Sequence, residues 1–548
     1  MRVFTASLAL VVMLAFGALA QQSDSNRKKA DKPKSEQPAV AKPAESKPAE
    51  NPKTVEERRP EAEKSDQGDK EEHFDVSEAP PVVTHHQTTL DGKLLKYTAT
   101  AGRLPIKRGD GKIEAEMFFV AYTLDGQDPA KRPLTFSFNG GPGSASMWLH
   151  MGALGPKHVV LQQDGFMPAA PYRSADNAST ALDKTDIVMV DAIGTGFSRA
   201  ANAELSKKFW GVKGDIEAFG EFIRLYITRN DRWSSPLFLL GESYGTTRAA
   251  GISGYLADHG VSFNGIVLLS TVLNFQTLVS TNTNDQPYIL LLPTYTMIAA
   301  YHKKLAPELS QDLEKTRREV EHWASTEYAQ ALAKGDSMTA AERQAAVDQL
   351  TRYTGLSKEV VDQANLRLDV PKFTHYLLID QKLRVGRLDG RFKGPDPDGL
   401  LDTPFYDPTS AAILPPYNTV FNNYVRTELG YKTDMPYEVF AFQRGSGSRW
   451  DWGSAIQGFP DTAAELREAL AKNPFLKVLV MEGYYDLATP YYAANFTFDH
   501  LDLPADYRKN ISFATYDAGH MVYVHADSLA KFKRDLASFI DKSLPSGQ

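Results

Sequence analysis

Short apolar runs alternate with segments of helical periodicity along most of this 548-residue chain, and several runs end in glycine-rich loops. A first pair of runs covers residues 94–100 and 116–123. The later runs cover residues 134–138, 187–190, 237–240, 266–269, 478–481 and 511–516. Helical segments such as 215–229 and 527–541 separate or follow them. This alternation predicts an α/β fold with a mostly parallel central sheet and helices on both faces.

The pattern changes between residues 274 and 444. Two stretches there, 307–333 and 339–369, are rich in Ala, Glu, Lys and Arg and are expected to be helical. A loop is expected from Arg391 onward, where the sequence reads R-F-K-G-P-D-P-D-G-L-L-D-T-P. We interpret 274–444 as a helical cap inserted into an α/β domain. The two parts of that domain are residues 81–273 and 445–548.

The first 20 residues have the features of a secretory signal peptide. Arg2 gives a basic start, residues 8–16 are apolar, and Ala18-Leu19-Ala20 fits the small-x-small cleavage pattern. The apolar run is shorter than the roughly 20 residues that span a bilayer, so we expect cleavage and no stable membrane insertion afterwards. The alternative is a retained anchor. The signal predicts an exported protein, periplasmic or secreted.

Residues 21–80 are predicted to be a disordered linker. Lys, Glu, Pro and Ala dominate the segment, and no aromatic residue occurs between Gln21 and His73. Such a sequence cannot bury enough apolar area to offset the entropy lost on ordering.

Charge and composition exclude several classes of function. A net charge of −7 removes the attraction that a nucleic-acid-binding protein needs. The absence of cysteine excludes disulfides, cysteine catalysis and thiolate zinc sites. His85 and His86 are adjacent but have no companion ligands, and no phosphate-binding loop is present, so we expect neither a metal nor a cofactor.

The sequence G-E-S-Y-G at Gly241–Gly245 follows an apolar run and opens a helical segment. That setting is typical of a nucleophile elbow, in which a tight turn exposes a serine hydroxyl at the end of a strand. The helix N-terminus behind it favours negative charge. We therefore predict that Ser243 is a nucleophile.

A nucleophilic serine needs a base, and the elbow arrangement places the acid and then the histidine later in the chain. His520 directly follows the run 511–516 and precedes the final helix, so it should lie beside the elbow. His500 and His525 lack this position. We predict that His520 is the base.

Four carboxylates are candidates for the group that orients His520. Asp486 follows the run 478–481 by a few residues, in G-Y-Y-D-L-A-T-P. Asp517 is tethered only three residues before His520, and Asp499 and Asp502 flank an expected surface turn. We therefore predict that Asp486 orients His520 and stabilises its imidazolium, as the acid of a catalytic triad does.

Acyl transfer also needs hydrogen-bond donors for an oxyanion. The loop N-G-G-P-G-S at residues 139–144 follows an apolar run and is rich in glycine, so its N–H groups are free to point at a ligand. The N–H of Tyr244, after the nucleophile, would be the second donor.

Five motifs together resemble the serine carboxypeptidase family of α/β-hydrolases, over roughly residues 85–275 and 445–541. They are N-G-G-P-G-S at 139–144, D-A-I-G-T-G-F-S at 191–198, G-E-S-Y-G at 241–245, G-Y-Y-D at 483–486 and A-G-H-M-V at 518–522. The resemblance implies an α/β-hydrolase fold, whereas the cap between residues 274 and 444 has no match in it. Together with the predicted signal peptide and the absence of cysteine, it indicates a bacterial exported member of the family. It also implies a hydrolase that releases C-terminal amino acids from peptides with a free terminal carboxylate.

The resemblance assigns a role to each matching residue. Ser243, Asp486 and His520 become the catalytic triad, and Gly141 and Tyr244 the oxyanion donors. Asn139, Gly140 and Glu242 are implied to bind the terminal carboxylate of the substrate. A protonated Glu242 can donate to that carboxylate, whereas an ionised one would repel it.

Three positions depart from the family pattern or stay open. A Glu that pairs with the elbow Glu in the family is Ala153 here, which should change the proton affinity of Glu242. The usual cysteine of the oxyanion loop is Ser144. Arg248, just past the elbow, is either a carboxylate-binding residue or a helix-surface charge, and we expect the latter. An esterase or acyltransferase on the same scaffold is the alternative function.

Overall fold

The structure is a computed structural model that describes residues 74–545, except 398, 400, 403–405, 442–449 and 454–457. The predicted signal peptide and the predicted linker as far as residue 73 lie outside the described residues. At Phe74 the chain is already joined to the domain, because its N–H donates to the carbonyl of Ala201 at 2.9 Å.

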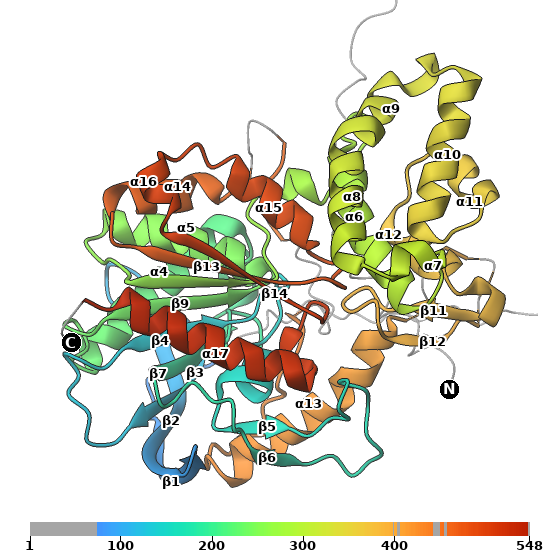
Figure 1. Ribbon diagram of the computed structural model, residues 1–548. Coiled ribbons are helices and arrows are strands. Elements are labelled where there is room, and N and C mark those ends of the chain that lie inside the picture. Colours follow the sequence, from blue (N-terminus) through green and yellow to red (C-terminus); the bar gives the residue numbers. More distant parts are fainter. Residues whose placement is uncertain are drawn as a thin grey trace, which may run out of the picture.

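A ten-stranded sheet forms the centre of the molecule (Figure 1), in the order β1-β2-β3-β7-β4-β9-β10-β13-β14, with β8 paired to β3. The strands are β1 Val82–Leu90, β2 Lys93–Lys107, β3 Ile113–Leu124, β4 Leu134–Phe138, β7 Asp186–Val190, β8 Arg199–Ala200, β9 Leu237–Glu242, β10 Gly265–Leu269, β13 Lys477–Gly483 and β14 Ile511–Tyr516. All neighbours from β7 to β14 are parallel. The pairs among β1, β2, β3 and β7 are antiparallel. The predicted mostly parallel α/β sheet is confirmed.

Helices cover both faces of this sheet. Figure 1 shows α4, α5 and α14 on one face and α17 on the other. The helices outside the insertion are α2 Met147–Leu149, the π-helical turn His150–Leu154, α3 Ala203–Phe209, α4 Val212–Arg229, α5 Tyr244–Asp258, α14 Ala463–Lys472, α15 Tyr491–Asp499, α16 Ala505–Arg508 and α17 Ala526–Ser543.

Each central strand contributes to a core on both sides. In β10, Ile266 and Leu268 pack in the cluster that contains residues of α4, α5 and α14. The alternate residues Val267 and Leu269 pack in the cluster that contains residues of α17. Because both faces are covered, these strands are apolar at nearly every position, which is why they read as short continuous runs in the sequence.

Helices dominate the chain between β10 and β13. They form a lobe, yellow in Figure 1, beside the sheet, and one further helix, α13, that lies below the lobe. The helices are α6 Gln286–Tyr301, α7 Pro307–Ser310, α8 Leu313–Trp323, a π-helical turn Ala324–Tyr328, α9 Ala329–Lys334, α10 Ala340–Thr354, α11 Lys358–Gln363, α12 Val370–Tyr376 and α13 Pro408–Thr427. Two small sheets occur among the described residues, β5 Lys157–Val159 with β6 Ser174–Asp176 and β11 Leu383–Val385 with β12 Lys393–Pro395.

The second predicted helical stretch of the insertion is two helices with a turn between them. A capping box between Thr339 and Glu342 starts α10, and Gly355 ends it in the left-handed conformation at φ 69°. Ser357 then caps α11 through the N–H of Val360. The expectation of a loop from Arg391 onward is wrong at β12, because Lys393–Pro395 forms a strand that pairs with β11.

Arg248 is not the helix-surface charge that was expected. Its side chain is completely buried and forms an ion pair with Asp215 of α4, Nε to Oδ2 at 2.7 Å. A second guanidinium nitrogen donates to the carbonyl of Asn139 at 2.6 Å. The expectation failed because α4 supplies the buried counter-charge from 33 residues away, a contact that helical periodicity does not reveal.

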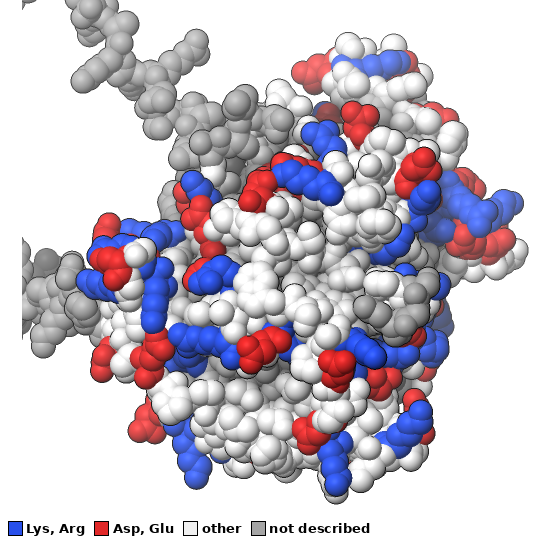
Figure 2. Space-filling view, turned by 90° about the vertical axis from the view of Figure 1, so that its left-hand side faces the viewer, with Lys and Arg blue, Asp and Glu red and all other residues white. Residues whose placement is uncertain are grey.

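The surface carries charges of both signs. Figure 2 shows Lys and Arg interspersed with Asp and Glu over one face of the molecule, without a large area of a single sign. No helix in the described ranges is long and apolar enough to cross a membrane.

Replacing Asp215 by Ala should lower the free energy of unfolding by about 3–5 kcal/mol, because it leaves Arg248 charged and buried without its counter-charge. Urea unfolding followed by fluorescence measures the change. Glu221→Ala, which removes a partly exposed ion pair with Arg224 on the same helix, should cost no more than about 1 kcal/mol.

The double variant Asp215→Ala/Arg248→Met removes the orphaned charge and should recover part of the loss. A single Asp215→Ala variant as stable as the unmodified protein would show that the buried pair does not contribute.

Candidate active site

Ser243 lies in a sharp turn between the last residue of β9 and the first residue of α5. Its backbone has φ 61° and ψ −131°, a strained conformation for a residue with a side chain. The Ser243 N–H donates to the carbonyl of Leu269 at 2.9 Å, and its own carbonyl accepts from the N–H of Thr246 at 2.8 Å. The turn is thus fixed from both sides, with Ser243 partly exposed at the N-terminus of a 15-residue helix.

Glycines around the turn allow the loop after β4, the end of β9 and the start of α5 to approach each other. A Cβ atom on Gly241 would collide with the carbonyl of Gly245, and one on Gly140 would collide with the N–H groups of Tyr244 and Gly245. The loop after β4 therefore lies directly against the start of α5. This close approach brings the two predicted oxyanion donors, on Gly141 and Tyr244, to the same place in the fold.

The loop after β4 is itself well ordered. The side-chain oxygen of Asn139 accepts from the N–H of Leu149 at 3.0 Å, and the Asn139 N–H donates to Oγ of Ser146 at 3.2 Å. Gly141 has φ 106° and is exposed, so its backbone is accessible to a ligand. Asn139 is buried beneath it.

His520 and Asp486 are in direct contact. Nδ1 of His520 lies 2.7 Å from Oδ2 of Asp486, and both side chains are buried. The carboxylate also accepts from the N–H groups of Ala488 and Thr489 at 2.7 and 3.0 Å, and from the Thr489 hydroxyl at 2.8 Å. Asp486 is therefore held in one orientation, and Nδ1 of His520 is directed toward it.

Of the four carboxylates considered from the sequence, Asp486 is the one in contact with His520. The other three, Asp499, Asp502 and Asp517, are exposed. His500 and His525 also lie away from this contact, since His500 bonds to the carbonyl of Phe496 and His525 to the hydroxyl of Ser528. These contacts are 2.7 and 2.8 Å long.

Backbone hydrogen bonds join the serine, acid and histidine segments at the carboxyl ends of the strands. Ser270, the residue after β10, donates its N–H to the carbonyl of Met481 in β13 at 2.8 Å. The Ser270 hydroxyl donates to the carbonyl of His520 at 2.6 Å. The carbonyl of Leu269, the last residue of β10, accepts from the Ser243 N–H at 2.9 Å, so the three segments meet at one edge of the sheet.

No hydrogen bond joins the Ser243 hydroxyl to the His520 imidazole in the described part of the chain. Such contacts are often long in substrate-free enzymes and shorten in the substrate complex. Ser243 and the His520–Asp486 pair thus share one edge of the sheet, where they are bonded to the neighbouring residues Leu269 and Ser270.

Burial disfavours a charged His520, but the charge and the hydrogen bond of Asp486, together with the charge of Glu242, raise the pKa of the imidazole above its usual value. A higher pKa makes the imidazole a stronger base when it is neutral. It also means that activity that depends on neutral His520 should fall as the pH drops through that raised pKa.

Glu242, the residue before the nucleophile, is buried. Burial raises its pKa to about 7, although the charge of His520 and the polar groups of Tyr523 and Asn139 lower it. Oε2 of Glu242 has no hydrogen-bond partner of standard geometry within the described ranges. Near neutral pH the side chain is therefore divided between its protonated and its ionised form.

Two tyrosines near Glu242 were not anticipated from the sequence. A Cβ atom on Gly152 would collide with the ring of Tyr523 and would lie 2.5 Å from the hydroxyl of Tyr417, so both rings pack against Gly152, the residue before Ala153. Tyr523 lies three residues after His520, and this short spacing could have indicated it. Tyr417 comes from α13 of the insertion, where no motif marked it.

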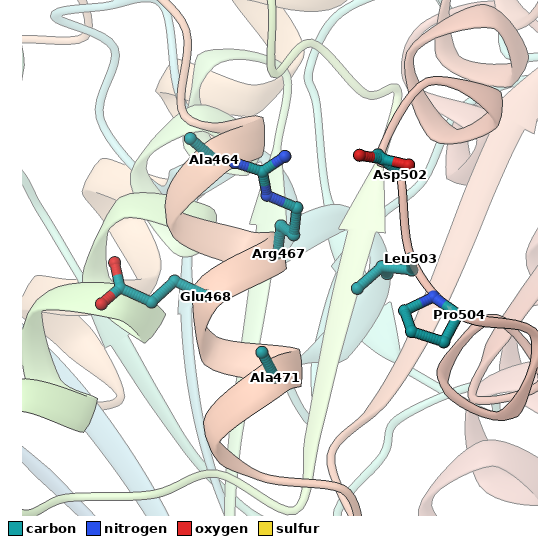
Figure 3. Close-up of a pocket in the computed structure, with 7 residues that line it drawn as sticks. All are labelled: Ala464, Arg467, Glu468, Ala471, Asp502, Leu503 and Pro504. Carbon is teal, nitrogen blue, oxygen red and sulfur yellow. The ribbon is translucent and has the colours of Figure 1, made fainter.

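A surface pocket elsewhere contains none of the predicted site residues. It lies between α14 and the turn at residues 502–504 (Figure 3). Its lining residues are Ala464, Arg467, Glu468, Ala471, Asp502, Leu503 and Pro504. They include no nucleophile or histidine, so this pocket offers no alternative centre for acyl transfer.

Comparison with known proteins gives one family match. The family model for serine carboxypeptidases matches residues 95–510. A search of curated proteins gives no match.

Solved structures of low similarity include a proline iminopeptidase from Mycobacterium smegmatis, at 14% identity, with 81% of this chain and 98% of that chain covered and a TM-score of 0.34. A putative aryl esterase from Burkholderia cenocepacia has 14% identity, 81% and 99% coverage and a TM-score of 0.33. A carboxyl esterase from Bacillus coagulans has 13% identity, 80% and 98% coverage and a TM-score of 0.32.

Replacing Asp486 by Asn should lower the pKa of His520, because burial then acts without the opposing carboxylate charge. Titration of the imidazole nitrogens by NMR, with ¹⁵N-labelled histidine, measures it. Asp517→Asn, an exposed carboxylate three residues before His520, should leave that pKa unchanged. Equal titration curves for the unmodified protein and the Asp486 variant would contradict the assigned contact.

Proposed function

Because the chain belongs to the serine carboxypeptidase family and is thus a hydrolase acting on peptide bonds, we propose that Ser243, His520 and Asp486 are its catalytic triad. The observation that carries this proposal is the 2.7 Å contact between the buried Asp486 and His520, at the same sheet edge as a strained, partly exposed Ser243. Fold alone would not specify these residues.

In the first half-reaction, Oγ of Ser243 attacks the carbonyl carbon of the last peptide bond while His520 takes the hydroxyl proton. Asp486 keeps Nδ1–H of the imidazole directed to itself and stabilises the imidazolium. The N–H groups of Gly141 and Tyr244 stabilise the oxyanion. His520 then returns the proton to the leaving nitrogen, the C–N bond breaks, and the terminal amino acid departs.

In the second half-reaction, water attacks the acyl-enzyme. His520 accepts a proton from the water, and the tetrahedral intermediate collapses with return of that proton to Oγ of Ser243. The products are the shortened peptide and the free enzyme. Each half-reaction uses the same base and the same oxyanion donors, so one arrangement of side chains is sufficient.

Asn139, Gly140 and Glu242 are proposed to bind the free terminal carboxylate of the substrate. They lie at the ends of β4 and β9, next to the nucleophile. A protonated Glu242 donates a hydrogen bond to a carboxylate, whereas an ionised Glu242 repels it. A neutral ester has no group that needs this arrangement, which favours a peptidase over the esterase or acyltransferase alternative.

The signal-like sequence of residues 1–20 supports export of the protein to the periplasm or the medium. The negative net charge is consistent with peptides, and not nucleic acid, as the partner.

Incubation of the protein with a mixed pool of peptides, followed by mass spectrometry, should show successive single-residue losses from the carboxyl end. Ser243→Ala should reduce this turnover by roughly 10⁶-fold, as removal of the nucleophile does in other triad hydrolases. Ser253→Ala, a buried serine further along α5, is the matched control and should stay active.

Internal cleavage, or losses from the amino end, would contradict exopeptidase action. Substantial turnover by a folded Ser243→Ala variant would remove Ser243 from its role.

The affinity for an N-blocked dipeptide should weaken as the pH rises through about 7, because Glu242 then loses the proton with which it binds the substrate carboxylate. In Glu242→Gln the KM should be nearly independent of pH over this range, since the amide keeps its donor. Glu116→Gln, a buried glutamate of β3, should retain the original dependence. A KM profile unchanged in the Glu242 variant would exclude this residue from carboxylate binding.

A further inference from the structure

A short strip of the insertion, residues 386–391, lies between the two loops that carry Asp486 and His520. On the acid side it is joined to both neighbours of Asp486. The N–H of Leu487 donates to the carbonyl of Arg387 at 3.1 Å, and the N–H of Gly390 donates to the carbonyl of Tyr485 at 2.9 Å. The strip therefore pairs with the backbone on either side of the acid.

The same strip is joined to the loop that carries His520, which we call the histidine loop. The N–H of His520 donates to the carbonyl of Leu388 at 2.6 Å. The N–H of Gly519 donates to Oδ2 of Asp389 at 2.9 Å. Two consecutive peptide groups of the histidine loop thus depend on two consecutive residues of the insertion.

Asp389 is fixed by a buried ion pair. Its carboxylate accepts from Nε and from a terminal nitrogen of Arg391 at 2.9 and 2.6 Å, and from the Arg391 N–H at 3.0 Å. Asp389 is 1% exposed and Arg391 4% exposed. The Asp389 N–H donates to the hydroxyl of Thr409 in α13 at 3.2 Å. A charge-assisted, bidentate pair of this kind is rigid.

Contact between the strip and the histidine loop leaves no spare room. A Cβ atom on Gly519 would lie 2.5 Å from Cα and Cβ of Asp389 and from the carbonyl oxygen of Leu388. Any shift of Asp389 is therefore transmitted to the peptide that precedes His520.

We infer that Asp389 is a positioning residue for His520, through which residues 386–391 of the insertion set the alignment of the base with its acid. Its carboxylate holds the Gly519–His520 backbone, while the carbonyl of Arg387 and the N–H of Gly390 hold the Asp486 loop. The inference rests on the proposed triad and adds to it a group that does not touch the substrate.

Loss of the Asp389 carboxylate should lower the reaction rate, because it displaces the proposed base. Misplacing a catalytic group by about 1 Å can lower the rate by about 10²-fold. Removal of the Asp389 carboxylate leaves the Gly519 N–H and the Arg391 guanidinium buried without their acceptor. The histidine loop and the strip then separate or rearrange, and the imidazole moves relative to Ser243.

The test compares Asp389 with Asp396, another buried carboxylate of the insertion. Asp396 pairs with Arg384 and His375 at 3.2 and 2.7 Å, so its removal also leaves buried groups unpaired. Asp389→Ala should lower kcat by about 10²-fold with little change in KM, since the proposed carboxylate-binding residues are untouched. Asp396→Ala should keep kcat within about threefold, as expected for a purely structural site.

Asp389→Asn keeps an oxygen that can accept from Gly519 and should restore kcat part of the way. It also serves as the test if the alanine variant does not fold. A readout independent of activity is the NMR signal of the His520 Nδ1 proton in the Ser243→Ala background. This signal should shift in the Asp389 variants and stay in place in Asp396→Ala.

Equal effects of the Asp389 and Asp396 substitutions on kcat, or an unshifted His520 signal in both Asp389 variants, would overturn the inference. Failure of the proposed function is distinguishable, because it would appear as activity that survives in Ser243→Ala. A dead Ser243→Ala variant with fully active Asp389 variants refutes the positioning role alone.

Discussion

Parallel pairing of β9, β10 and β13 determines where the other parts of the candidate site lie. The Ser243 N–H is held by the last residue of β10, and the residue after it, Ser270, is held by Met481 of β13. Because parallel strands end at a common edge, the elbow, the acid loop and the histidine loop are delivered to the same side of the sheet. A change in this register would separate the three functional groups even if every side chain were unchanged.

Much of this architecture was predictable because it depends on local sequence. The buried strands read as apolar runs since both faces are covered, and the glycines at positions 241 and 245 indicate a tight turn between strand and helix. The order of Ser243, Asp486 and His520 along the chain then follows from the elbow arrangement. The structure brings Asp486 into contact with His520, and the catalytic roles of the three residues stay a prediction.

Other features depend on contacts between distant segments and could not be predicted from periodicity. Arg248 was expected at the surface, but its counter-charge comes from α4 and its position is fully buried. Tyr417 approaches the neighbourhood of Glu242 from α13 of the insertion, and Asp389 reaches Gly519 over 130 residues of sequence. Composition and local pattern carry no information on such pairings, because they arise only when the insertion folds back onto the strand ends.

The junction between residues 386–391 and the loops that carry Asp486 and His520 restricts how the insertion can diversify. Among the described residues, helices α9 to α11 contribute none of the hydrogen bonds that join the strip to those loops, so their length and shape are less constrained. The strip itself must be retained in any chimaera that exchanges the surrounding helices for those of a relative. Sequence change can therefore accumulate in one part of the lobe while this short strip keeps the two loops aligned.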